Sequence, residues 1–319
     1  MGAEKKTRLV VLAIGGNSLI RDKDHQSVED QFEVTRETCK HIREMIELGW
    51  TVVVTHGNGP QVGFILRRSE LSVQELHPVP LPSIGADTQG AIGYMIQQCL
   101  SNELRAAGLE RPVVTVVTQV LVDRADPAFQ SPSKPIGSFM DEALALKHRR
   151  EDGWDVKEDA GRGWRRVVAS PLPREILELD AVRLLVEAGV VVIAVGGGGI
   201  PVIRNAAGEL EGVPAVIDKD YASALLANHL QAERFIISTG VEQVCVNYNK
   251  PGQRALSSLT LGEARRLLEE GQFPAGSMGP KIQAVASYLE AGGPEAIITS
   301  PECLARALQG EAGTRILPG

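Results

Sequence analysis

Three lysines of this chain lie in sequence contexts that favour chemistry on an anion. Lys134 is in SPSKPIG, Lys219 in VIDKDYAS and Lys281 in SMGPKIQ, so each stands beside glycine, proline or aspartate instead of on the polar face of a helix. Any one of them could be an ordinary solvated surface lysine. Together, three cations in such contexts indicate a site that neutralises a negatively charged group, such as a phosphoryl group.

The neighbours of two of these lysines support that interpretation. Lys219 lies between Asp218 and Asp220, whose carboxylates can orient its ammonium group through charge-assisted hydrogen bonds. Lys281 follows Met-Gly-Pro at the predicted start of a helix, where the helix dipole disfavours a cation. A bound anion would account for that placement.

Three glycine-rich segments each follow an apolar, β-branched run. They are Gly15-Gly16-Asn17 after residues 7–14, Gly57-Asn58-Gly59 after residues 51–55, and Gly196 to Gly199 after residues 190–195. One such segment alone could be an ordinary tight turn. Glycine turns at the carboxyl ends of parallel strands expose backbone N–H groups that bind anions, so three of them predict a phosphate-binding edge of a sheet.

Several familiar phosphate-binding motifs are excluded. The segment GGGGIPV has a proline where the helix of a GxGxxG dinucleotide motif should begin, and it continues as extended chain. The chain contains no GxxxxGK[ST] and no HRD or DFG set, which excludes a P-loop enzyme and a protein kinase. Phosphate chemistry here needs another scaffold.

The elements that must position these loops alternate between strands and helices. An amphipathic helix at 28–48, ending at Gly49, connects the strands at 7–14 and 51–55 and makes a βαβ unit with parallel strands. The alternation continues with helices near 87–107, 174–188, 221–230, 260–270 and 280–291 and strands near 113–118, 190–195, 234–238, 243–247 and 295–299. This pattern predicts an α/β fold, a three-layer α/β/α sandwich with a mainly parallel sheet and two lobes, 1–195 and 196–319.

Residues 123–168 break this rhythm. They hold three prolines, a charged helix near 139–151 and a hairpin that turns at residues 160–163. Connections this long inside a compact domain are usually functional or form a separate unit. We therefore expect a small protruding subdomain, or lid, that carries Lys134.

Composition limits the partners. With 43% hydrophobic and 23% charged residues the chain is globular, and its formal charge of −7 with no basic face argues against nucleic acid. The four cysteines, Cys39, Cys99, Cys245 and Cys303, show no metal-binding spacing and are expected as reduced core residues. No segment is long and apolar enough for a membrane span or secretory core, which predicts a cytoplasmic protein.

Eight segments of the chain, in order, resemble the carbamate kinases of the amino acid kinase family. They are AIGGNSL (13–19), HGNGPQVG (56–63), DPAFQSPSKPIG (126–137), RRVVASPLP (165–173), GGGGIPV (196–202), EGVPAVIDKDYAS (211–223), NYNKPGQ (247–253) and MGPK (278–281). The resemblance spans nearly the whole chain. It implies a homodimeric enzyme that transfers a phosphoryl group between carbamoyl phosphate and ADP, with Mg²⁺ carried by the ATP or ADP phosphates and no metal ligand from the protein.

The resemblance also implies roles for individual residues. The catalytic group is Lys134, Lys219, Lys281 and Asp220, in which the lysines neutralise the transferring phosphoryl group and Asp220 orients them. The substrate-binding group is Gly15, Gly16, Asn17, Gly57, Asn58, Gly59, Gly197 and Gly198. The nucleotide-handling group is Asp218, Lys219, Thr239, Tyr248, Met278, Gly279 and Lys281.

Two other functions stay open at this point. The same fold could phosphorylate another small acid, as acetylglutamate kinases do. A non-catalytic sensor of nucleotide or carbamoyl phosphate is the second alternative, although a pure binder has no need for three lysines matched to a transition state. The sequence leaves open the physiological direction, the resting state of the lid, and whether the pathway is arginine or purine breakdown.

Overall fold

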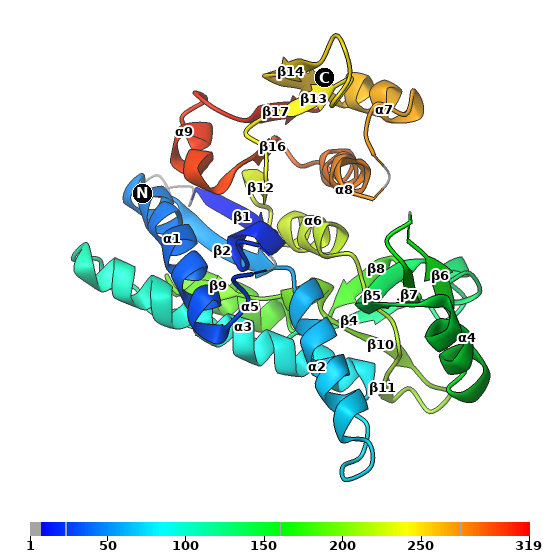
Figure 1. Cartoon of the computed structure of the whole chain (residues 1–319). Helices are drawn as coiled ribbons and strands as arrows, with labels where there is room; N and C mark the ends of the chain where they lie inside the picture. The colour runs from blue at the N-terminus through cyan, green and yellow to red at the C-terminus, as the bar shows by residue number, and fades with distance from the viewer. Residues whose placement is uncertain (1–7, 23, 160, 275) are drawn as a thin grey trace.

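The computed structural model describes residues 8–22, 24–159, 161–274 and 276–319. Its centre is an eight-stranded sheet with the order β15-β17-β16-β12-β1-β2-β9-β3 (Figure 1). The strands are β1 Leu9–Ile14, β2 Thr51–His56, β3 Val113–Thr115, β9 Val191–Ile193, β12 Arg234–Ser238, β15 Ser258–Thr260, β16 Ala296–Thr299 and β17 Thr314–Leu317. Neighbouring strands are parallel except for the β16–β17 pair, so the predicted mainly parallel sheet is confirmed.

Helices cover both faces of this sheet because successive strand residues point to opposite sides. Val10 and Leu12 of β1 lie in the core under α1 (Val28–Glu47), α3 (Leu81–Ala106) and α9 (Leu304–Leu308). Val11 and Ala13 lie in the opposite core with α5 (Leu179–Glu187), α6 (Lys219–His229), α7 (Leu261–Glu269) and α8 (Met278–Glu290). These layers form the predicted α/β/α sandwich, and burial on both faces explains why β1 and β2 are continuous apolar runs.

Helix starts follow from local capping. Ser27 caps α1: its hydroxyl accepts a hydrogen bond from the Asp30 N–H (3.1 Å), and the Asp30 carboxylate accepts one from the Ser27 N–H (2.9 Å). Asp218 caps α6, with its Oδ1 accepting from the Asp220 N–H at 3.0 Å. This cap holds the turn that carries Lys219 and Asp220 in a defined position.

A four-stranded sheet, β11-β10-β4-β8, and a protruding subdomain complete the fold. The four strands are β4 Gln119–Val122, β8 Pro173–Ile176, β10 Ile200–Arg204 and β11 Leu210–Gly212. The subdomain consists of a sheet β5-β7-β6 (β5 Lys134–Met140, β6 Val156–Glu158, β7 Trp164–Val168) and α4 (Glu142–Glu151), set to one side of the molecule (Figure 1). Strands β6 and β7 form the predicted hairpin, although Ala160 in its turn lies outside the described residues.

One expectation about an individual element was wrong, and one helix was not predicted. The helix predicted at 174–188 begins only at Leu179, because the residues before it form β8 and pair with β4 (Val120 opposite Ile176). The apolar spacing before Leu179 gives no sign of that pairing. Helix α2 (Gly59–Ser72), which begins directly after the second glycine loop, was not predicted. A small hairpin, β13 (Val244–Val246) with β14 (Arg254–Leu256), lies near the C-terminus.

Both halves of the chain contribute to the central sheet. Strand β12 from the C-terminal half pairs with β1, the first strand of the chain. The division into lobes 1–195 and 196–319 stays a prediction. Within the described residues, no helix has the length and apolar character needed to cross a membrane.

Candidate active site

The three glycine loops meet at one edge of the central sheet. Strands β1, β2 and β9 are parallel and consecutive in the sheet, so Gly15, Gly57 and the tetraglycine loop follow their carboxyl ends on the same side. The Gly57 N–H donates to the carbonyl of Ile14 (3.1 Å), which ties the second loop to the first strand. Thr239 follows β12, the strand on the other side of β1.

A buried carboxylate joins two of the three predicted lysines. Asp220 lies in the first turn of α6 and is only 3% exposed. Its Oδ1 accepts a hydrogen bond from Lys219 Nζ, and its Oδ2 accepts one from Lys281 Nζ at 2.9 Å. Lys281 comes from the first turn of α8, so the N-termini of two helices meet at this carboxylate. Helix N-termini favour negative charge, which adds to the attraction of this place for an anion.

The charged groups in this cluster shift one another's pKa values. Burial by itself would raise the pKa of the Asp220 carboxyl, but Lys219 and Lys281 outweigh burial and hold this pKa well below its usual range. Burial lowers the pKa of the Lys219 ammonium group, and the neighbouring Asp220 opposes that shift. In the described part of the chain each of these two ammonium groups donates to Asp220 alone, which leaves N–H donors for a ligand.

Lys134 reaches the cluster from the protruding subdomain. Its Nζ donates to Oδ2 of Asp218 at 2.6 Å, and Asp218 is also the cap of α6. Asp218 therefore links the lid to the turn that carries Lys219 and Asp220. Three ammonium groups surround two carboxylates, which leaves one positive charge in excess at this edge of the sheet.

The second and third glycine loops pack against this cluster. A Cβ atom on Gly57 would lie 3.4 Å from Cδ of Lys219. A side chain on Gly197 would collide with Asn58, whose Nδ2 donates to the Thr88 hydroxyl at 2.9 Å. A side chain on Gly198 would collide with the carbonyl of the residue that precedes Asp218. Glycine is therefore required at 197 and 198 for close packing.

Other predicted substrate residues border open space. Gly16 begins a short 3₁₀ turn, Gly16–Ser18, and Gly59 is the first residue of α2. A Cβ atom on either would meet no atom of the described residues within 4 Å, whereas one on Gly15 would lie 3.2 Å from the Ser238 carbonyl oxygen. The side chain of Asn17 lies outside the described part of the structure.

A cavity of about 340 Å³ lies beside Lys281. Four of the seven predicted nucleotide-handling residues line it, namely Thr239, Tyr248, Met278 and Lys281. Gly279 follows Met278 in α8 and is not on the cavity wall. Asp218 and Lys219 are also absent from the wall and lie in the lysine–aspartate cluster. The other lining residues are Gly240, Val241, Gln243, Cys245, Phe273, Pro274 and Ser277.

One lining residue corrects an expectation. Cys39, Cys99 and Cys303 are buried as predicted, but Cys245 is only half-buried and borders the cavity. Its strand β13 lies in a two-stranded hairpin, which places the side chain beside the cavity wall instead of in a core. Alternation in so short a strand gave no sign of this.

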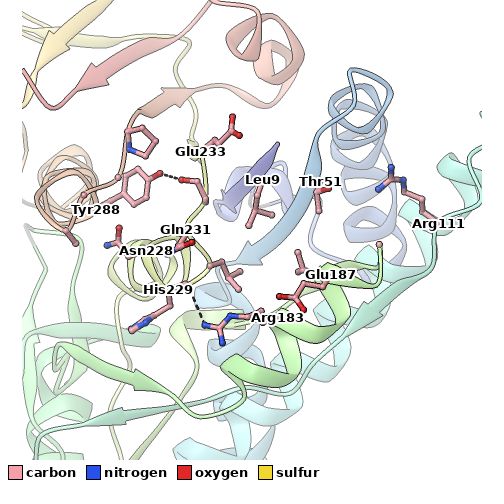
Figure 2. Close-up of a pocket in the computed structure, with 18 residues that line it drawn as sticks. Leu9, Thr51, Arg111, Arg183, Glu187, Asn228, His229, Gln231, Glu233 and Tyr288 are labelled. Atoms are coloured by element: carbon pink, nitrogen blue, oxygen red, sulfur yellow. Dashed lines mark hydrogen bonds between the residues drawn. The ribbon is translucent and has the colours of Figure 1, made fainter. Parts of the chain in front are cut away.

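A larger cleft of about 940 Å³ lies at the opposite, amino-end edge of the sheet (Figure 2). Leu9 and Thr51, the first residues of β1 and β2, line it. Two of its polar side chains are engaged with backbone: Tyr288 donates to the Ala232 carbonyl (2.6 Å) and Arg183 to the His229 carbonyl (3.3 Å). The three lysines singled out from the sequence and the glycine loops lie at the carboxyl-end edge instead, so the chemistry is expected there.

Comparison with known proteins identifies the family of this chain. The amino acid kinase family matches residues 8–300. The chain is 50% identical over 312 residues to the carbamate kinase-like protein YahI of Escherichia coli (97% of this chain, 98% of that protein). It is 48% identical over 311 residues to the carbamate kinase of Pyrococcus furiosus (97% and 99%). The structure of the carbamate kinase from Giardia lamblia bound to AMP-PNP superposes with a TM-score of 0.92 at 40% identity, covering 98% of this chain and 99% of that one.

The family match covers most of the chain, and these relatives match 97% and 98% of its length. The observed fold agrees, since the carbamate kinase from Giardia lamblia superposes on it over nearly its whole length. This chain therefore belongs to the amino acid kinase family and, within it, to the carbamate kinases.

Proposed function

We propose that this protein catalyses the reversible transfer of a phosphoryl group between carbamoyl phosphate and ADP, which gives carbamate and ATP. Carbamate then decomposes to ammonia and CO₂. In this reaction the protein is a phosphotransferase with a carboxyl group as acceptor. The identity to the carbamate kinase of P. furiosus, 48% over 97% of this chain, supports the proposal.

One observation carries it: Lys281 belongs to two sites at once. It lines the 340 Å³ cavity with Thr239, Tyr248 and Met278, and it donates to Asp220, which also holds Lys219. A nucleotide in that cavity would direct its phosphates at the lysine–aspartate cluster. The glycine loops of β1, β2 and β9 lie at the same edge and would hold the carbamoyl end.

The proposed roles follow from charge. Phosphoryl transfer spreads negative charge over the oxygens of the moving group, so the protein acts by positioning and by electrostatic stabilisation. Lys219 and Lys281 neutralise these oxygens while Asp220 keeps both ammonium groups in place. Lys134 completes the set from the lid. The phosphoryl group moves directly between the two substrates, without a phosphoenzyme.

Mg²⁺ enters this proposal as part of the nucleotide substrate. Within the described residues, no group of three or more His, Cys, Asp or Glu side chains is placed to hold a metal. Asp218 and Asp220 are already paired with lysines, and the remaining donors are ammonium and backbone N–H groups, which bind phosphate oxygens. The cation neutralises phosphate charge while bound to the nucleotide.

The lid is proposed to exclude water. Carbamoyl phosphate is a labile acyl phosphate, and closure of residues 123–168 over it would protect it from hydrolysis. Hydrogen exchange in this segment should slow when substrates bind, and unchanged exchange would remove the idea. The homodimer, the cytoplasmic location and the two-lobe division stay predictions, and light scattering of the purified protein tests the first.

The decisive experiment is ATP formation from ADP, Mg²⁺ and carbamoyl phosphate by the purified protein, with a metal-free control. We expect Lys219→Ala to lower kcat by about a hundredfold or more, because loss of one such donor typically costs about 3 kcal/mol of transition-state stabilisation. Lys147→Ala is the matched control, since Lys147 is an exposed lysine on α4 whose one ion pair among the described residues is with Glu151. A loss below about threefold in folded Lys219→Ala would remove that lysine from the mechanism.

A substrate screen separates the alternatives. One relative is named only carbamate kinase-like, so acetyl phosphate and acetylglutamate phosphate belong in the screen beside carbamoyl phosphate. ATP from another acyl phosphate alone would identify a different small-acid kinase. ADP binding without turnover of any of them would identify a sensor.

A further inference from the structure

The residue directly before the tetraglycine loop, Val195, has a backbone conformation that valine rarely adopts. Gly197, Gly198 and Gly199 have φ angles of 67°, 94° and 86°, which glycine adopts readily. Val195, directly before the loop, has φ 53° and ψ 34° and is completely buried. A β-branched residue in the left-handed region is a genuine outlier, and it persists only where surrounding structure holds it.

Thr118 holds this backbone through its hydroxyl and its carbonyl. The Val195 N–H donates to the Thr118 hydroxyl at 3.0 Å, and that hydroxyl donates to the Val116 carbonyl at 2.8 Å. The Thr118 carbonyl accepts from the Ile200 N–H at 2.9 Å, on the far side of the glycines. Thr118 is fully buried. Its hydrogen bonds to Val195 and Ile200 hold the residues on both sides of the four glycines.

Gln89 of α3 completes the network. Its Oε1 accepts from the Thr118 N–H at 2.7 Å. Its Nε2 donates to the Thr118 carbonyl and to the Gly196 carbonyl, each at 3.0 Å. Gln89 is 1% exposed, and its amide uses both N–H donors and its carbonyl oxygen on Thr118 and Gly196.

The loop that these two residues hold touches the lysine–aspartate cluster. A side chain on Gly198 would collide with the Ile217 carbonyl, directly before Asp218 and Lys219. A side chain on Gly197 would collide with Asn58 of the second loop. The Gly198 and Gly199 N–H groups donate within this turn, to the Val195 and Gly196 carbonyls (3.1 and 3.0 Å), so a shift of Val195 would move the whole tetraglycine backbone relative to the lysines.

We propose that Gln89 and Thr118 are positioning residues that hold Val195 in the left-handed conformation and thereby aim the tetraglycine loop at the carbamoyl end of the substrate. The inference rests on the proposed function. It predicts an effect confined to that end, because the cavity beside Lys281 is lined by other segments.

Thr118→Val removes the hydroxyl that accepts from the Val195 N–H. We expect kcat to fall, and KM for carbamoyl phosphate to rise, each by at least about tenfold. KM for ADP should change by less than about twofold. Thr118→Ser, which keeps the hydroxyl, should restore kcat/KM to within about threefold of the parent enzyme. Gln89→Met, which keeps Thr118, should act in the same direction with a smaller effect.

Thr35→Val is the matched control, since Thr35 is an equally buried threonine whose hydroxyl donates to a backbone carbonyl within α1. Val195→Gly in the Thr118→Val background should recover activity, because glycine adopts the left-handed conformation without the hydroxyl. Equal changes in both KM values, or no rescue by serine or by Val195→Gly, would overturn the proposal.

A crystallographic comparison separates this proposal from the proposed function. If the parent enzyme fails to use carbamoyl phosphate, the function is wrong, but the conformation of Val195 in Thr118→Val and Gln89→Met crystals still decides the positioning role. Val195 should leave the left-handed region in at least one of these variants and stay in it in Thr118→Ser. An unchanged φ in both would overturn the proposal, whatever the substrate.

Discussion

Two buried carboxylates, one at each edge of the central sheet, are held by two cations each. Asp220 at the carboxyl-end edge binds Lys219 and Lys281, and Glu295 at the amino-end edge binds Arg234 (2.8 Å) and Arg315 (2.6 Å). Asp220 is 3% and Glu295 4% exposed. The carboxylates are alike in burial and pairing, so the difference between the sites lies in the cations.

At the amino-end edge the excess positive charge reaches water, because the side chains of Arg234 and Arg315 are 26% and 41% exposed. At the carboxyl-end edge the side chains of Lys219 and Lys281 are 13% and 16% exposed, beneath glycine loops. Little solvent screens their excess charge, which on the proposed function is available to a phosphate. On the proposed function, the same motif ties strands together at one edge and would stabilise an anion at the other.

Glu295→Gln tests the structural side of this comparison. We expect the free energy of unfolding to fall by about 3 kcal/mol, the lower end for a broken buried pair because both arginines reach solvent. Turnover at 25 °C should change by less than about twofold. Urea unfolding beside steady-state kinetics measures both, with the exposed Glu302→Gln as control. A large loss of turnover in Glu295→Gln at unchanged stability would contradict the purely structural role of the amino-end edge.

Lys134→Ala tests the catalytic side. We expect kcat to fall by about a hundredfold, because a donor to the moving phosphoryl group is lost. Stability should change by less than about 1 kcal/mol, since the Lys134–Asp218 pair is partly exposed and such pairs contribute little. Lys147→Ala on the same subdomain should leave both quantities unchanged. A large loss of stability in Lys134→Ala with normal turnover would mean that Lys134 stabilises the fold and has no catalytic role.

His56, at the carboxyl-end edge, makes the stability of the protein depend on pH. Burial lowers the pKa of His56 to about 4, so the folded protein keeps it neutral. Between pH 7 and pH 5 the unfolded chain takes up a proton at this histidine that the folded protein does not, so stability falls as the pH falls. The loss is about 2 kcal/mol for a shift of this size.

Urea unfolding at both pH values checks this expectation. His56→Gln should lack about 2 kcal/mol of the pH-dependent loss, while His77→Gln, at an exposed position, should keep it. An NMR titration that places the His56 pKa near its ordinary value would contradict the expected burial effect.

The reactivity of Cys245 tests whether the nucleotide binds in the cavity beside Lys281. Iodoacetamide should label this half-buried thiol first, because burial raises the pKa of the Cys39 and Cys99 thiols and suppresses their reaction. ADP at ten times its Kd should slow labelling about tenfold, since it occupies most of the sites. Peptide mass spectrometry measures the rate. Labelling that ADP leaves unchanged would place the nucleotide outside this cavity.

Local patterns accounted for the elements that depend on near neighbours in the chain. The apolar runs of β1 and β2 and the amphipathic α1 predicted a βαβ unit, and the parallel pairing of β1 with β2 follows from it. The wrong start of α5 and the missed α2 come from contacts that such patterns do not encode. β8 exists because it pairs with β4, about fifty residues earlier in the chain.

The sequence by itself determined that glycine loops would follow parallel strands, and parallel strands bring their carboxyl ends to one edge. It also singled out the lysines by their neighbours. Only the tertiary structure decided which charges pair: Lys134 with Asp218, Lys281 with Asp220, and the arginines with Glu295. These partners are far apart in the chain, and their pairing depends on how helices and the lid pack, because burial and distance set the strength of a charge pair.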